Sequence, residues 1–147
     1  MAASSQEDHV RRLLMELRLM QGSAETLEQR LGVLQTAVAD LRLASSSLNA
    51  LKDLEEGAPI LVPTGGGTFA NATLGDLSKV IVGVGADVSV EMELEDAIGD
   101  VSSRLEDMEK ASQSVRQQLE QILVQMQSHQ EVLNRLGAQL QGESPGV

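Results

Sequence analysis

The sequence contains no cysteine, tryptophan or tyrosine, and Phe69 is its single aromatic residue. The absence of cysteine excludes disulfide bonds, thiol catalysis and cysteine-based metal sites. A compact globular core usually takes much of its bulk from aromatic side chains, whereas 41% of this chain is hydrophobic and only 1% is aromatic. A core built from leucine, valine, isoleucine, methionine and alanine is typical of a coiled-coil seam.

Long apolar runs and positive charge are also scarce. No stretch of about 18 apolar residues occurs, so we expect no membrane-spanning segment. Charged residues interrupt the start of the chain, so we expect no signal-peptide core. The 22 acidic residues outnumber the 11 basic ones and give a formal net charge of -11. Because such a chain repels phosphate backbones and anionic lipids, we expect no nucleic-acid or membrane partner. We expect a soluble, cytoplasmic protein.

A strict apolar periodicity begins at Val10. Apolar residues then alternate at spacings of three and four, the period of a left-handed coiled coil, and after Leu41 the stripe shifts one position early. We expect residues 1–8 to fray and a helix to span residues 9–56, because Gly57 and Pro59 provide a C-cap and a stop. The seam positions are Val10, Leu13, Leu17, Met20, Ala24, Leu27, Leu31, Leu34, Val38, Leu41, Ala44, Leu48 and Leu51.

A second periodic segment predicts a helix over residues 94–141, followed by a disordered tail at 142–147. Two arms of matched length predict an antiparallel hairpin, because the partner within the same chain has a high effective concentration. The alternative is two parallel coiled coils formed with other chains. The seam positions are Leu94, Ile98, Val101, Leu105, Met108, Ser112, Val115, Leu119, Ile122, Met126, His129, Leu133, Leu136 and Leu140.

Residues 58–93 have a different composition, with short β-branched runs punctuated by glycine. This pattern predicts strands and tight turns, at about 60–63, 68–74, 79–84 and 87–92. The turns fall at 64–67 and 85–86. Two hairpins with so little core of their own are not expected to be stable alone. Their edges and apolar faces predict pairing with other chains, so we interpret the insertion as an oligomerisation module.

No residues form a convincing catalytic or metal-binding constellation. The glycines at 65–67 lead into a predicted strand and no lysine follows, so a hairpin turn explains them better than a phosphate loop. His9 and His129 are the only histidines. His129 occupies a seam position, where a polar residue can fix the register of a coiled coil. We predict that the chain is not an enzyme and has no cofactor or metal.

The whole pattern is mainly α with a small β insertion, an antiparallel coiled-coil helical hairpin whose two arms flank two β-hairpins. This layout, within a single domain of residues 1–147, resembles the alpha class of prefoldin subunits, nearest to the archaeal branch. The likeness is specific in sequence over residues 60–97. It is carried by Val62-Pro63, Gly65, Gly67, Phe69, Val84-Gly85, Val90-Glu91 and Asp96-Ala97.

The resemblance implies an ATP-independent chaperone that assembles as a hexamer of two alpha and four beta subunits. In that family the hairpins form a β-barrel platform, and the arm tips hold unfolded polypeptides and pass them to a group II chaperonin. Two alternatives are a structural coiled-coil scaffold and an alpha-like subunit that forms filaments. The expected oligomerisation residues are Ile60, Val62, Phe69, Leu74, Val80, Val82, Val84, Val88 and Val90.

The first turns of the predicted N-terminal helix carry apolar residues away from the seam. With Val10 at heptad position a, Leu14 falls at e, Met15 at f and Leu19 at c. Position f points directly away from the seam, so a buried two-helix contact does not account for Met15. Methionine suits a surface that adapts to many partners. The alternative is packing against a neighbouring arm, and Leu123 and Val124 have no assigned role. The expected client-binding tip is Val10, Leu13, Leu14, Met15, Leu19, Met20, Val132, Leu133, Leu136 and Leu140.

Overall fold

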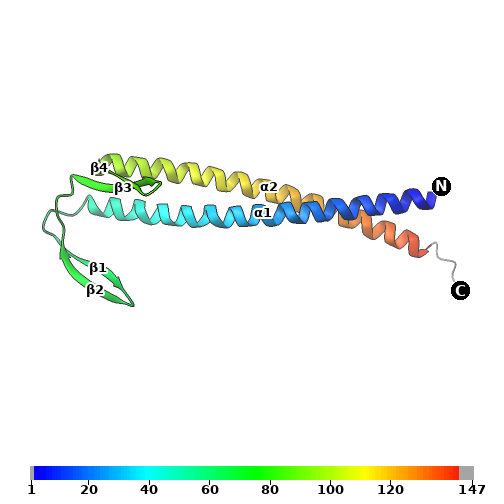
Figure 1. The fold of residues 1–147 in the computed structure, drawn as a ribbon, viewed down its shortest axis with the longest axis horizontal. Helices are drawn as coiled ribbons and strands as arrows, with labels where there is room; N and C mark the ends of the chain where they lie inside the picture. Colours follow the sequence, from blue (N-terminus) through cyan, green and yellow to red (C-terminus); the bar gives the residue numbers. More distant parts are fainter. Residues whose placement is uncertain (1, 143–147) are drawn as a thin grey trace. The chain divides into compact units, whose positions relative to one another are not determined.

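The computed structural model describes residues 2–142 as two long helices separated by two β-hairpins (Figure 1). This order confirms the predicted fold. The predicted tail at 142–147 lies outside the described residues, except for Gly142, which belongs to the second helix. The elements are α1 (Ala2–Leu51), β1 (Pro59–Gly65), β2 (Thr68–Thr73), β3 (Lys79–Gly85), β4 (Val88–Glu93) and α2 (Leu94–Gly142).

The chain divides into two compact units. One contains residues 1–35 and 110–147 and is called the terminal unit below; the other contains residues 36–109 and is called the hairpin unit. In both units, segments of α1 and α2 lie side by side and run in opposite directions (Figure 1). The antiparallel arrangement predicted from the matched arm lengths is therefore confirmed.

The seam positions of both helices are buried or half-buried, apart from Leu140. Leu13, Leu17, Ala24 and Leu27 form the most buried run in α1. Because these positions recur every three or four residues, they line one stripe of the helix, and burial of that stripe stabilises a helix whose exposed faces are polar. Ser112, the first polar residue of the seam, is also buried.

Both predicted bounds of α1 are wrong. The helix begins at Ala2, because no glycine or proline interrupts the segment that was expected to fray. It ends at Leu51, five residues early, where successive backbone N–H groups donate to carbonyls three residues back, as Leu54 does to Leu51 at 3.2 Å. Gly57 therefore does not cap the helix. It lies in a separate turn, with φ 88°, closed by Ala58 N donating to Glu55 O at 3.1 Å.

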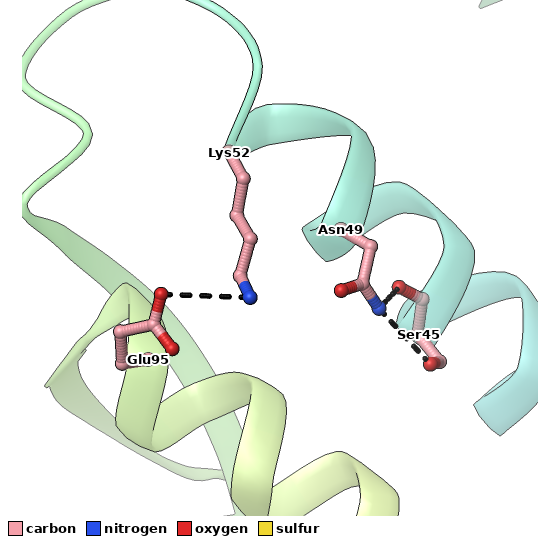
Figure 2. Close-up of polar contacts among 4 residues, drawn as sticks. All are labelled: Ser45, Asn49, Lys52 and Glu95. Carbon is pink, nitrogen blue, oxygen red and sulfur yellow. Dashed lines mark hydrogen bonds and ion pairs between the residues drawn. The ribbon is translucent and has the colours of Figure 1, made fainter.

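Exposed polar contacts surround the end of α1 and the start of α2. Figure 2 shows Lys52 reaching toward Glu95, with Nζ 3.5 Å from Oε1, and Asn49 Nδ2 donating to the Ser45 carbonyl at 2.8 Å. Glu95 lies in the first turn of α2, where a carboxylate is favoured by the helix dipole. Since both members of the ion pair are exposed, its contribution to stability is small.

Each hairpin closes with a two-residue loop in which both residues have positive φ. The φ values are 57° and 78° at Gly66 and Gly67, and 51° and 59° at Ala86 and Asp87. Loops of this kind match the right-handed twist of the flanking strands. Asp87, which was expected to start a strand, therefore belongs to the turn. Neither Ala86 nor Asp87 is glycine, so this second loop holds a left-handed conformation that costs about 1 kcal/mol per residue.

Candidate interaction surfaces

The first hairpin exposes apolar side chains on both of its faces. Pairing of Ile60 with Ala72 and of Val62 with Ala70 places these residues on one face, while Leu61 and Phe69 lie on the other. Leu61 is 63% exposed and Phe69 61% exposed. A two-stranded sheet with an uncovered apolar face is only marginally stable by itself. The exposed residues Leu61 and Phe69 are called the hairpin surface below.

The second hairpin is anchored to the helices of its own unit. Val82 of β3 is 9% exposed, and it lines a pocket together with Leu41 and Leu48 of α1 and Val101 of α2. Arg104 Nη1 donates to the carbonyl of Gly83 at 2.9 Å. One face of β3 is therefore fixed by an apolar contact and a charge-assisted hydrogen bond.

The structure separates the predicted oligomerisation residues into three groups. Val82 is buried within its own chain, and its part in a contact with other chains stays a prediction. Ile60, Leu74 and Val80 are half-buried. The exposed members are Val62, Phe69, Val84, Val88 and Val90.

Two further exposed residues were missed by the sequence prediction. Leu61 of β1 shares one face of the first hairpin with Phe69 of β2, and Ile81 of β3 is 77% exposed. Both are large aliphatic residues in predicted strands, so the signal was present. The sequence prediction took alternate residues along each strand, because it assumed that only one face of the strand is apolar. Leu61 and Ile81 were therefore left out.

In the terminal unit, three apolar side chains of α1 point away from the seam. Leu14 is 48% exposed, Met15 66% and Leu19 68%. They follow one another along the fourth and fifth turns of α1, and they are called the tip surface below. Leu13, which was also placed in the client-binding tip, is buried in the seam, and its part in client binding stays a prediction. Leu140 is exposed, and the half-buried members are Val10, Met20, Val132, Leu133 and Leu136.

A histidine and a glutamate connect the two helices beside the tip surface. His129 Nε2 of α2 lies 2.7 Å from Glu16 Oε2 of α1, and His129 Nδ1 lies 2.9 Å from the carbonyl oxygen of Gln125. A carbonyl oxygen only accepts hydrogen bonds, and the same is true of an ionised carboxylate. The arrangement therefore suits the doubly protonated imidazolium. The hydrogen bond with Glu16 is the main cause that raises the pKa of His129 above its ordinary value of 6.5, against the opposing effect of desolvation.

A model of the prefoldin subunit family matches residues 20–139 of this chain. The prefoldin subunit alpha of Methanothrix thermoacetophila is 34% identical over 111 residues, which cover 76% of this chain and 72% of the relative.

The chain belongs to the prefoldin family.

A second relative and a solved structure extend the match. The prefoldin subunit alpha of Methanospirillum hungatei is 30% identical over all 147 residues and 98% of its own length. A cryo-EM structure of filamentous PFD from Methanocaldococcus jannaschii superposes with a TM-score of 0.63 at 26% identity, covering 76% of this chain and 92% of that one. The resemblance to prefoldin alpha subunits is thereby confirmed, and with it a chaperone-type subunit role.

Negative charge in this prefoldin subunit is concentrated in the hairpin unit. Residues 36–109 contain 14 acidic and 4 basic residues, whereas the rest of the chain contains 8 acidic and 7 basic residues. The terminal unit is therefore close to neutral, and the tip surface does not repel acidic polypeptides. Within residues 2–142, no helix has a stretch apolar enough to cross a membrane. No three histidine or acidic side chains of that range gather as metal ligands would.

Replacing Glu16 with glutamine is expected to bring the pKa of His129 back toward 6.5, because the hydrogen bond to a carboxylate is the main cause of the raised value. NMR titration of the imidazole measures this directly. A group whose pKa is raised by folding contributes stability below its unfolded value of about 6.5 and loses it as the pH rises through the folded value. Wild-type thermal stability should therefore fall from mildly acidic to mildly alkaline pH more than that of Glu16→Gln. An unchanged titration in the variant would contradict the pairing.

Proposed function

We propose that this prefoldin subunit belongs to an ATP-independent cytoplasmic chaperone that binds unfolded polypeptides at the tip surface, prevents their aggregation and delivers them to a group II chaperonin. The observation that carries the proposal is the exposure of Leu14, Met15 and Leu19 on a helix whose seam is already filled. Contiguous exposed apolar side chains on a helix indicate an interaction site. Leucine and methionine, unbranched at Cβ, also adapt to partners of different shape.

Assembly supports the same proposal. Exposed apolar residues on the hairpins need cover that the described part of the chain does not provide, and strands with open edges pair readily with other strands. We assign these residues to a β-barrel contact with beta-class prefoldin subunits, in a hexamer of two alpha and four beta subunits. Relatives named prefoldin subunit alpha support this choice of partner.

A filament-forming subunit is the second candidate function, favoured by the likeness to filamentous PFD. In that case the hairpin surface would contact further copies of the same chain. The concentration of acidic residues in the hairpin unit opposes this at low salt, because copies that meet through their hairpins bring like charges together. Sedimentation of the isolated chain at low and high salt separates the two candidates: a filament grows without a beta-class subunit.

Replacing Leu14, Met15 and Leu19 together with serine is expected to abolish most of the protection of a denatured client. Light scattering of the client after dilution from denaturant measures this, with the chain alone and with a beta-class subunit. Since all three positions are exposed, the helix and the assembly should be retained, as circular dichroism and size measurement can verify.

The matched control replaces Val33, Leu43 and Val124, three similarly exposed apolar residues outside the tip surface, with serine. It removes comparable apolar area and should protect the client as well as wild type does. If the tip variant protects equally well, client binding lies elsewhere. If the wild-type chain protects no client, either alone or with a beta-class subunit, a purely structural scaffold explains the protein better.

A further inference from the structure

Arginine side chains are interleaved with the apolar residues of the tip surface. Arg11 lies three and four residues before Leu14 and Met15, and Arg18 lies four and three residues after them. Leu19 follows Met15 by four residues, so the five side chains lie on the same side of α1, about one helical turn from their partners at these spacings. All five are exposed. A polypeptide lying along these turns would meet apolar and cationic groups in alternation.

These arginines differ from the basic residues of the hairpin unit. There, Arg42, Lys52 and Arg104 each pair with a carboxylate of the same unit. In the described part of the chain, neither Arg11 nor Arg18 forms an ion pair. Residues 11–19 contain three arginines and one acidic residue, Glu16, so this stretch is locally cationic in a chain of net charge -11.

We propose that the tip surface selects unfolded segments in which apolar side chains are flanked by carboxylates, with Arg11 and Arg18 as the specificity-determining residues. The apolar residues supply affinity by burial, and the guanidinium groups favour acidic neighbours and disfavour basic ones by charge complementarity. This selectivity rests on the client binding proposed above, and it adds the chemical class of the client segment that is bound.

The test uses three unstructured peptides that share one leucine-rich core and differ only in their flanks, which are glutamate, glutamine or lysine. Binding to the full-length chain is measured by fluorescence anisotropy. We expect the glutamate-flanked peptide to bind about tenfold more tightly than the lysine-flanked one at low salt. The preference should vanish near 1 M salt, where the Debye length is about 3 Å.

Replacing Arg11 and Arg18 with glutamine should reduce the preference about fivefold. The matched control replaces Arg30 and Arg116, two exposed arginines of the terminal unit that lie away from the tip surface in sequence, and should keep the preference. Equal binding of all three peptides by wild type would overturn the selectivity and leave client binding intact, whereas binding of none would overturn both. A changed sedimentation coefficient for Arg11→Gln/Arg18→Gln without peptide would overturn the assignment, because it would place a second copy of the chain on the tip surface.

Discussion

Replacing Val82 with aspartate is expected to lower the free energy of unfolding of the chain by about 3 kcal/mol, from lost apolar burial and from burying a carboxylate without a partner. Val82 is the one buried strand residue of the β-hairpins, and it holds β3 against both helices of the hairpin unit. Urea unfolding followed by circular dichroism gives the change. Any loss of assembly in this variant then follows from the damaged subunit rather than from a contact between subunits.

The adjacent residue provides the control. Ile81 follows Val80 and precedes Val82 in the same strand, but its side chain is 77% exposed, so Ile81→Asp should change the free energy of unfolding by no more than about 0.5 kcal/mol. Equal destabilisation by Val82→Asp and Ile81→Asp would mean that β3 does not pack the face carrying Val82 against the helices.

Replacing Leu61 and Phe69 together with aspartate is expected to dissociate the assembly while leaving the subunit folded. Both residues are largely exposed in the single chain, so their replacement costs the subunit little. In the proposed interface each would place a charge in an apolar contact, and a central interface residue is worth about 2 kcal/mol. The dissociation constant should therefore rise about a thousandfold. Analytical ultracentrifugation with a beta-class subunit measures the change.

Val33→Asp/Leu43→Asp is the matched control, because these helical residues are at least as exposed and equally apolar. It should assemble as wild type does. An intact complex with Leu61→Asp/Phe69→Asp would remove the face that carries Leu61 and Phe69 from the interface. The opposite face, with Ile60 and Val62, would then be the candidate.

The sequence by itself determined the elements and the seam. Spacings of three and four between leucine, valine, alanine and methionine specify which stripe of a long helix is buried, and this information is local. The same heptad frame places Leu14, Met15 and Leu19 off the seam, and their exposure follows from that placement. Paired glycines likewise located the first hairpin loop, since a residue such as Gly66 is free to adopt positive φ.

Only the tertiary structure decided which face of a hairpin is covered and which polar groups meet across the helices. Both faces of the hairpins carry apolar residues, so alternation could not show that Val82 is buried while Ile81 and Leu61 are open. Heptad phase placed His129 in the seam, but it could not pair that residue with Glu16, 113 positions away. Strand and helix periodicities depend on near neighbours in sequence. The covered face and the axial register depend on contacts between segments that meet only after folding.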